Sequence, residues 1–126
     1  NVPAQHAIQV ALGGRQSIFE LTGTGGRLLR QRNIAYEKLN EIPGVSAVKP
    51  MGSLYLFPRL DPNVYEIHDD AKLMLDILKA EKILMVQGTG FNWPNPDHFR
   101  VVTLPWASQI ENAIERLGNF LVSYKQ

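Results

Sequence analysis

Residues 87–105 contain the side chain best suited to chemistry in this sequence. The segment begins as a strand, breaks into a loop of Gly, Pro and Asn, and returns as an apolar strand over 99–104 that carries one arginine, Arg100. Such apolar neighbours indicate burial on at least one face, and a buried guanidinium needs an anionic partner. Arg100 is therefore either half of an internal ion pair or a two-pronged clamp for a carboxylate ligand. The residues alone favour the ion pair, since most arginines are structural or surface groups.

Two other motifs suggest binding sites less strongly. The triplet His68-Asp69-Asp70 has metal-ligand residue types, but adjacent residues rarely converge on one ion, so capping of the following helix is favoured. The loop Thr22–Gly26 leads into a helix, where backbone N–H groups can hold a phosphate. It has neither the Gly-Lys-Ser/Thr signature nor a clear strand before it, which favours a plain connection. We predict no metal site.

Composition narrows the class of protein. The chain has 126 residues, 44% of them hydrophobic and 20% charged, which is typical of one soluble globular domain. A net charge of +1 does not suggest a nucleic-acid partner or an acidic membrane surface. No apolar run approaches the roughly 20 residues of a membrane span. The absence of cysteine and of a signal peptide is compatible with a cytoplasmic location, and the missing initiator methionine suggests a trimmed or excised chain.

The spacing of apolar residues predicts regular elements along the whole chain. We expect helices over residues 3–12, 27–42, 69–81 and from 108 onward, and strands over 45–48, 53–57, 83–86 and 99–104. Residues 15–21 are ambiguous and are compatible with one further helical turn. Residues 54–57 are apolar on both faces, which predicts a covered central strand.

Each helix has an apolar face. The face of the helix over 3–12 is equally compatible with a core contact and with a docking surface for something absent. In the helix over 69–81 the expected buried stripe is Ala71, Met74, Leu75 and Leu78, widened by Ile77. In the last helix it is Ile110, Ala113, Ile114, Leu117, Leu121 and Tyr124. That helix begins with a predicted capping box, in which Ser108 is the N-cap and Glu111 reaches back to it.

The order of elements indicates an α/β fold, or α+β sandwich: a small mixed, largely antiparallel sheet with helices packed on it. The strands within 44–58 and 83–87 are joined by a helix and should run parallel. The strand at 99–104 should return antiparallel, as a hairpin with a long tip. We expect one domain over 1–126, with a helical lead-in at 1–42 and a sheet-containing core at 43–126.

Four segments, taken in order, resemble a known family. They are Asn-Val-Pro-Ala-Gln at 1–5, Lys-Pro-Met-Gly-Ser-Leu-Tyr-Leu-Phe at 49–57, Val-Gln-Gly-Thr-Gly-Phe at 86–91 and His-Phe-Arg-Val-Val-Thr-Leu at 98–104. Together they resemble the C-terminal small (minor) domain of class I aminotransferases, the pyridoxal-phosphate enzymes of the aspartate aminotransferase fold. The runs at 25–32, 67–70 and 91–94 look most like the bacterial alanine (glutamate–pyruvate) aminotransferase branch.

The resemblance implies a role for Arg100. The arginine of the matching strand in this family binds the α-carboxylate of the substrates, here an amino acid such as alanine or glutamate and a 2-oxo acid such as pyruvate or 2-oxoglutarate. The family's Schiff-base lysine lies upstream of the segment that matches residue 1. None of the lysines of this chain sits in a matching motif; they are at 38, 49, 72, 79, 82 and 125. The resemblance thus implies no catalytic or cofactor-binding residue here, an inactive fragment, a missing large domain and an intact homodimer.

Two other interpretations remain open from the residues. The chain can be a stand-alone module that binds a small carboxylate or has a regulatory role, without catalysis. It can also be an interaction domain in which Arg100 pairs with an internal carboxylate. Tyr55, Trp93 and His98 either line the site or pack against their neighbours, and packing is favoured because aromatic side chains are mostly core residues.

Overall fold

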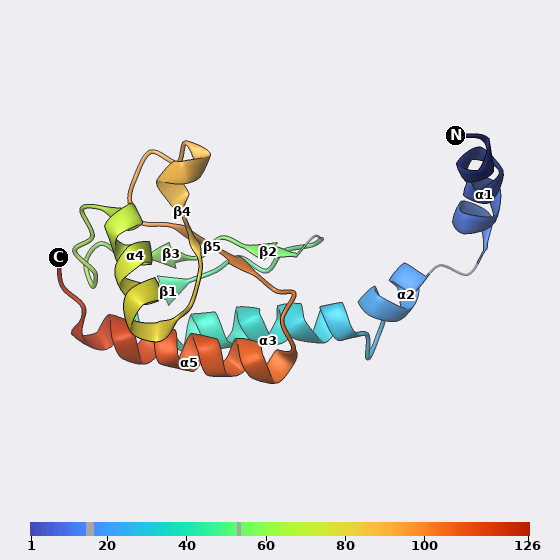
Figure 1. Cartoon of the computed structure of the whole chain (residues 1–126). Helices are drawn as coiled ribbons and strands as arrows, with labels where there is room; N and C mark the ends of the chain where they lie inside the picture. Colours follow the sequence, from blue (N-terminus) through green and yellow to red (C-terminus); the bar gives the residue numbers. More distant parts are fainter. Residues whose placement is uncertain (15–16, 53) are drawn as a thin grey trace.

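A computed structural model describes residues 1–14, 17–52 and 54–126. Figure 1 shows α3 and α5 side by side along one edge of the body, with the strands above them and α1 and α2 projecting to one side. The helices are α1 (Val2–Gly13), α2 (Ser17–Thr22), α3 (Arg27–Glu41), α4 (Asp70–Glu81), the 3-10 helix η1 (Gly88–Phe91) and α5 (Ala107–Ser123). The strands are β1 (Val45–Ser46), β2 (Tyr55–Leu56), β3 (Arg59–Leu60), β4 (Val86–Gln87) and β5 (Phe99–Val102).

The described strands form two small antiparallel sheets. β1 pairs with β3, and β5 lies between β2 and β4. The predicted hairpin is confirmed, because Val86 of β4 pairs with Arg100 of β5. β2 and β4 do run in the same direction, since both are antiparallel to β5, but β5 separates them. The fold class predicted from the sequence is confirmed, with largely antiparallel pairing and helices packed on the strands.

Several strands are shorter than predicted, and one is in a different place. The strand expected at 83–86 begins only at Val86, and Leu84 is 79% exposed, because α4 ends at Lys82 in a left-handed conformation and the chain needs the next residues to turn back. The prediction that residues 54–57 form a central strand was wrong. β2 is an edge strand and Tyr55 is 47% exposed. The central position belongs to β5.

The core lies between the sheet and the two long helices. Leu56 and Phe99, each 1% exposed, face it from the three-stranded sheet, and Leu39 of α3 and Leu117 of α5 meet them from below. Burying a side chain of this size stabilises the fold by about 1.5–3 kcal/mol. The division into a lead-in over 1–42 and a core over 43–126 stays a prediction, and α3 contributes to the same core as the strands.

The rotation of α4 differs from the prediction. Its buried residues are Asp70, Leu73, Met74 and Ile77. Of the predicted stripe only Met74 and Ile77 are buried, while Leu75 is 47% and Leu78 36% exposed. Apolar residues occupy most positions from 73 to 78, so the sequence is compatible with more than one inward face. The buried positions are spaced i, i+3, i+4 and i+7 from Asp70, which places that carboxylate on the inner stripe.

The start of α5 also differs from the prediction, although its packing face was right. The helix begins at Ala107, and the side chain of Gln109 accepts a hydrogen bond of 3.0 Å from the backbone N–H of Trp106. The predicted capping box of Ser108 and Glu111 is therefore wrong by two residues. The buried side chains of α5 are Ile110, Ile114, Leu117 and Leu121, as expected.

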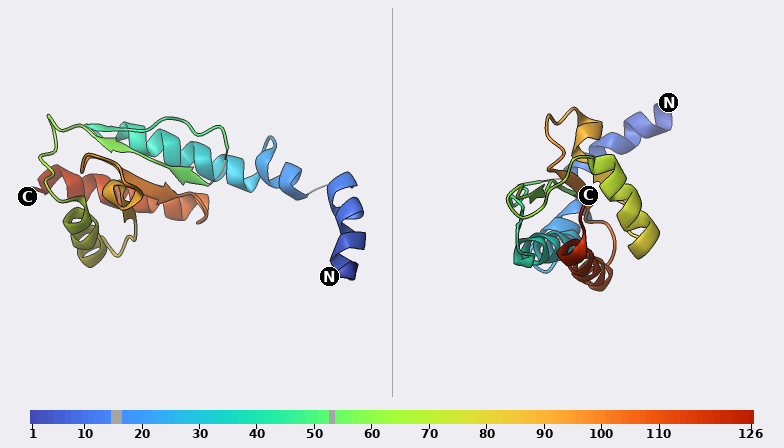
Figure 2. Two further views of the ribbon diagram at one scale, coloured as in Figure 1. Left: turned by 90° about the horizontal axis from the view of Figure 1, so that it is seen from above. Right: turned by 90° about the vertical axis from the view of Figure 1, so that its left-hand side faces the viewer.

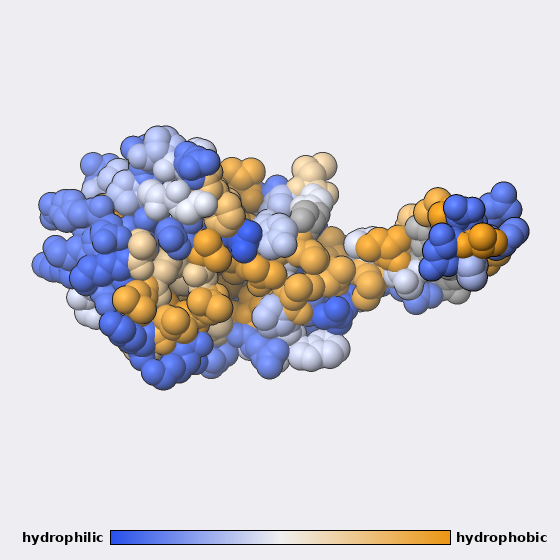
Figure 3. Space-filling view, turned by 45° about the horizontal axis from the view of Figure 1, so that its top comes forward, coloured by the Kyte–Doolittle hydropathy of each residue, from blue (hydrophilic) through white to orange (hydrophobic). Residues whose placement is uncertain are grey.

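The first two helices form an arm that leaves the body (Figure 2). The helix expected at 3–12 is confirmed as α1, but neither α1 nor α2 contains a buried residue. Large apolar side chains remain exposed along the arm, including Val10 at 76% and Phe19 at 68%; Figure 3 shows apolar surface continuing from the arm toward the body. In the ambiguous segment 15–21, residues 15 and 16 lie outside the described residues. No described helix is both long and apolar enough to cross a bilayer.

Neighbouring positions on α5 allow a matched test of the core. We expect Leu121→Ala, at a site 2% exposed, to lower the free energy of unfolding by about 2–5 kcal/mol because it leaves a cavity. Val122→Ala, at a site 80% exposed, should change it by less than about 0.5 kcal/mol. Urea unfolding followed by circular dichroism measures both values, and equal effects would contradict the packing described here.

Candidate functional site

Arg100 lies on the outer face of the three-stranded sheet. Tyr55 pairs with Val102, so Arg100, two residues before Val102, is the diagonal neighbour of Tyr55 on the same face. Leu56 and Phe99 alternate with these residues and point into the core. The strand thus separates an apolar inner face from an outer face that carries a cation.

Two aromatic rings contact the guanidinium of Arg100. Its Cζ atom is 4.8 Å from the centroid of the Tyr55 ring and 4.7 Å from that of Phe91. At this range a cation is attracted to the ring faces. The rings hold the guanidinium in place but accept none of its N–H groups as a carboxylate would, so the side chain keeps its capacity to bind an anion.

No carboxylate of the described residues pairs with Arg100. Its Nε atom is buried and lacks a hydrogen-bond partner there. The internal ion pair that the residues alone favoured is therefore not formed within residues 1–14, 17–52 and 54–126. Arg100 thus has a buried, unsatisfied donor and two flanking rings, and its role as a carboxylate clamp stays a prediction.

The loop between β4 and β5 is organised around Asp97. Its Oδ1 atom is 2.7 Å from Nδ1 of His98 and accepts a 3.0 Å hydrogen bond from Nε1 of Trp93. Its Oδ2 atom accepts a 3.1 Å hydrogen bond from Nε of Arg59. The His98 ring stacks on Phe57 at 4.9 Å and lies 4.4 Å from the Trp93 ring. Trp93 and His98 therefore pack within the loop, whereas Tyr55 lies at the site itself.

The hydrogen bonds to Asp97 determine its ionisation. Burial of the carboxyl raises its pKa, but the hydrogen bonds from His98, Trp93 and Arg59 together outweigh burial, so the pKa lies below its ordinary value. The ionised carboxylate thus stabilises the loop that leads into β5.

Phe91 is the site residue that sequence reasoning missed. It ends η1, directly after the glycine-rich run Gly88-Thr-Gly90, and the presence of an aromatic residue close to the arginine strand was the available signal. Gly88 allows the close approach of the two chain segments, because a Cβ there would lie 2.7 Å from the carbonyl oxygen of His98. The turn also contacts α4, where Asp70 accepts hydrogen bonds from Thr89.

The weaker candidate motifs have structural roles. Asp69 is the N-cap of α4 and accepts a 2.9 Å hydrogen bond from the backbone N–H of Lys72. No cluster of His, Asp and Glu able to hold a metal ion occurs among the described residues. In the glycine-rich loop, a Cβ on Gly26 would lie 2.4 Å from the carbonyl oxygen of Leu21, so the loop packs tightly against the end of α2.

The main apolar groove of the described residues does not coincide with Arg100. It is an apolar groove of about 760 Å³ between the first turns of α5, β5 and the segment 82–85, with Leu84, Leu104 and Ile110 in its wall. Arg100 is not part of this wall. The groove and Arg100 are therefore separate features of the surface, and the candidate site is defined by the residues around Arg100.

The lowered pKa of Asp97 gives a pH-dependent prediction. Asp97→Asn should lower the free energy of unfolding at pH values above the ordinary carboxyl pKa of 3.8, because the stabilisation from the ionised form is fully present there. The difference from the unmodified chain should shrink as the pH falls through the folded-state pKa. Thermal unfolding from pH 7 downward measures this difference, with the exposed Glu37→Gln as control; a difference independent of pH would contradict it.

The chain is similar to known aminotransferases over its whole length. No family model matches the sequence. The chain is 72% identical over all its residues to alanine aminotransferase of Mycobacterium tuberculosis (strain ATCC 25618 / H37Rv), covering 29% of that protein. It is 60% identical to glutamate-pyruvate aminotransferase AlaA of Escherichia coli (strain K12), again over its full length, and covers 31% of it. The chain thus spans less than a third of these relatives.

Solved structures of aminotransferases match the chain as well. The whole chain superposes on 31% of a crystal structure of an aminotransferase from Escherichia coli with a TM-score of 0.93 at 60% identity. An alanine aminotransferase from Pyrococcus furiosus matches 98% of the chain, over 30% of its own length, with a TM-score of 0.84 at 35% identity. The chain therefore belongs to the fold-type I aminotransferases, of which it is the C-terminal part.

Proposed function

We propose that this chain is the small domain of a pyridoxal-phosphate-dependent transaminase that exchanges an amino group between alanine or glutamate and pyruvate or 2-oxoglutarate. Relatives with 57–72% identity over the whole chain are named alanine aminotransferase or glutamate-pyruvate aminotransferase. The observation that carries the proposal is Arg100, which lies on the outer face of the sheet and pairs with no carboxylate of residues 1–14, 17–52 and 54–126. In this proposal it binds the α-carboxylate of each substrate.

The geometry suits a carboxylate that must be oriented. Two parallel hydrogen bonds from a guanidinium fix both the position and the plane of a carboxylate. The Tyr55 and Phe91 rings restrict the movement of the guanidinium, so less conformational freedom is lost when the substrate binds. The amino acid and the 2-oxo acid both carry an α-carboxylate, so one arginine serves both halves of the exchange. Held in this way, the reacting carbon has a defined orientation.

None of the lysines of this chain sits in a motif that matches the family's cofactor attachment site. When bound, pyridoxal phosphate supplies an electron sink and forms a covalent link to a lysine. Lys38 pairs with Glu41, Lys72 pairs with Asp76 and Lys49 lies over the Tyr36 ring, so these three are engaged elsewhere. We therefore assign the cofactor and its lysine to the rest of the protein, and we expect the 126 residues alone to be inactive.

The missing parts of the protein are also its proposed partners. The relatives are more than three times as long as this chain, which supports a large domain in the same polypeptide. We assign the exposed apolar side chains of α1 and α2 to contacts with that domain or with a second subunit, because large exposed apolar surfaces mark interaction sites. In this proposal the intact enzyme is a homodimer of the cytoplasm.

Substitution of Arg100 tests the proposal. In the intact protein with pyridoxal phosphate, Arg100→Ala and Arg100→Lys should lower kcat/KM for amino transfer from alanine to 2-oxoglutarate, by an amount equivalent to about 2–5 kcal/mol. Lysine keeps the charge but loses the fork of donors, so it should not restore activity. Steady-state kinetics with both substrates measures the loss.

A matched control uses an arginine with no such role. Arg30 is exposed on α3, and Arg30→Lys should leave kcat/KM unchanged. The proposed role of Arg100 fails if its lysine variant behaves like this control. The proposed activity fails if the intact protein transfers no amino group between any of the four substrates.

The proposed partners can be tested by size measurement. Light scattering after gel filtration should show the intact protein as a dimer and the isolated 126-residue chain as self-associating. Val10→Ser with Phe19→Ser should reduce association of the isolated chain, because both side chains lie on the exposed arm. Val122→Ser, on α5 at 80% exposure, is the control for exposure alone. A monomeric isolated chain would argue against the arm as a contact surface.

A further inference from the structure

We propose that Asp70 and Thr89 are positioning residues for carboxylate binding, because they hold Phe91 against the guanidinium of Arg100. The proposal rests on the proposed function of Arg100 and extends it to residues that do not contact the substrate. The different supports of the two rings, the burial of Asp70 and the hydrogen-bonded turn that joins Thr89 to Phe91 all point to this role.

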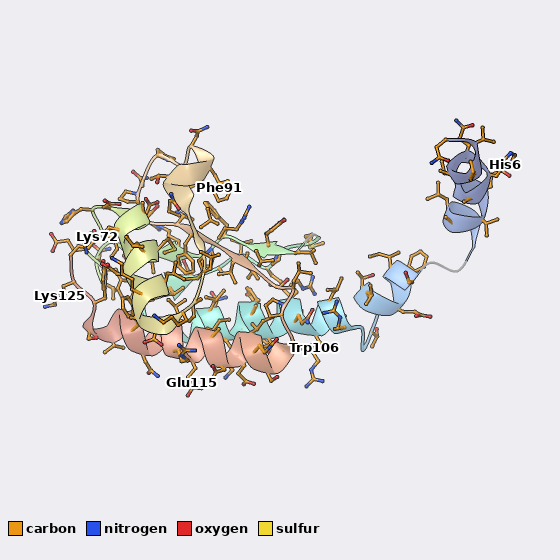
Figure 4. The ribbon with its side chains drawn as sticks, viewed as in Figure 1. His6, Lys72, Phe91, Trp106, Glu115 and Lys125 are labelled. Atoms are coloured by element: carbon orange, nitrogen blue, oxygen red, sulfur yellow. The ribbon has the colours of Figure 1, made fainter. Side chains whose placement is uncertain are left out.

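The two rings beside Arg100 are supported in different ways. Tyr55 is part of β2, where backbone pairing with Val102 fixes its position. Phe91 is not on a strand; it ends the four-residue helix η1 in the connection between β4 and β5. Figure 4 shows Phe91 on η1, above the strands of the sheet. A ring on a short connection needs a separate anchor if it is to stay 4.7 Å from Arg100.

Asp70 supplies that anchor. It is only 3% exposed, and its Oδ2 atom accepts a 2.9 Å hydrogen bond from the backbone N–H of Thr89. Its Oδ1 atom accepts a 2.6 Å hydrogen bond from the Thr89 hydroxyl. No Lys or Arg of the described residues pairs with Asp70, so these two bonds and the N-terminus of α4 are what offset its burial. Both oxygens of this buried carboxylate accept hydrogen bonds from the same loop residue, so Asp70 fixes the position of the loop relative to α4.

The hydrogen bonds of Asp70 restrict the position of Phe91 through a single turn of the chain. Thr89 and Phe91 lie in the same turn of η1, which is closed by a 3.0 Å hydrogen bond from the N–H of Asn92 to the carbonyl of Thr89. Asn92 has a left-handed conformation with φ of 59°, which ends the turn sharply. A shift of Thr89 therefore moves the ring of Phe91. Asp70 and Thr89 do not contact Arg100 directly, so their effect on a ligand must pass through that ring.

The test measures binding rather than turnover. The probe is propanoate, which has the carboxylate and carbon skeleton of alanine without the amino group, titrated into the intact protein and followed by ligand-observed NMR. Thr89→Val removes the hydroxyl with little change in shape and should weaken propanoate binding roughly tenfold, as expected for loss of a hydrogen bond to a charged group. Thr89→Ser keeps the hydroxyl and should bind like the unmodified protein. Because Thr89 is exposed, these changes should leave the fold intact.

A second substitution and a double-mutant cycle distinguish a positioning role from a general loss of stability. Asp70→Asn should weaken binding as Thr89→Val does, whereas Asp76→Asn, on the same helix but paired with Lys72 and Tyr124, should not. In a Phe91→Leu background, Thr89→Val should have no further effect on propanoate binding, because the two act in series. Additive losses, or binding within twofold of the unmodified protein for both Thr89→Val and Asp70→Asn, would overturn the proposal.

Failure of the proposed function gives a different result. If Arg100→Lys binds propanoate as tightly as the unmodified protein does, Arg100 is not the carboxylate site and the positioning proposal fails with it. If Arg100→Lys weakens binding while Thr89→Val and Asp70→Asn do not, Arg100 keeps its role and only the positioning proposal is lost.

Discussion

Arg100 has no anionic partner among the described residues, and this unpaired cation on the outer face of a small sheet is the constraint on which the candidate site depends. The alternation of side chains along β5 places Phe99 in the core and Arg100 on the opposite face. An unpaired guanidinium with a buried donor costs free energy, and aromatic contacts with Tyr55 and Phe91 offset only part of it. The strand is held by the core on its inner face, and the donor left unsatisfied on its outer face is what the proposed carboxylate would bind.

Two carboxylates fix the connection between β4 and β5 from opposite ends. Asp70 of α4 binds Thr89 at the start of the connection, and Asp97 binds Trp93 and Arg59 near its end. A long connection of this kind is ordinarily the mobile part of a hairpin. Here its polar groups are tied to a helix on one side and to β3 on the other. The ring of Phe91 consequently lies in a connection that is tied at both ends, and a fixed position of this kind suits the proposed binding site.

Sequence reasoning reached the elements whose signals are local and unambiguous. The stripe of α5 and the position of Arg100 on a hairpin strand follow from periodicity and from a single charge among apolar residues. The rotation of α4 could not be predicted, because an apolar run offers several inward faces and the choice depends on the buried contact of Asp70 with a residue 19 positions away. The edge position of Tyr55 was missed for a related reason. The aromatic residue on the outer face of β2 contacts Arg100, whereas the prediction assumed that a helix covers that face.

The two helices of the arm, α1 and α2, have no buried residue that would stabilise them. An isolated helix of 12 residues is marginal in water, and α1 contributes no buried residue to this chain. Yet the whole chain, arm included, superposes with a TM-score of 0.93 on an Escherichia coli aminotransferase more than three times as long. We infer that the arm's conformation is stabilised by the part of the protein beyond this chain. If the proposed function holds, the same missing part of the protein that packs on the arm would also carry the groups that act on a substrate bound at Arg100.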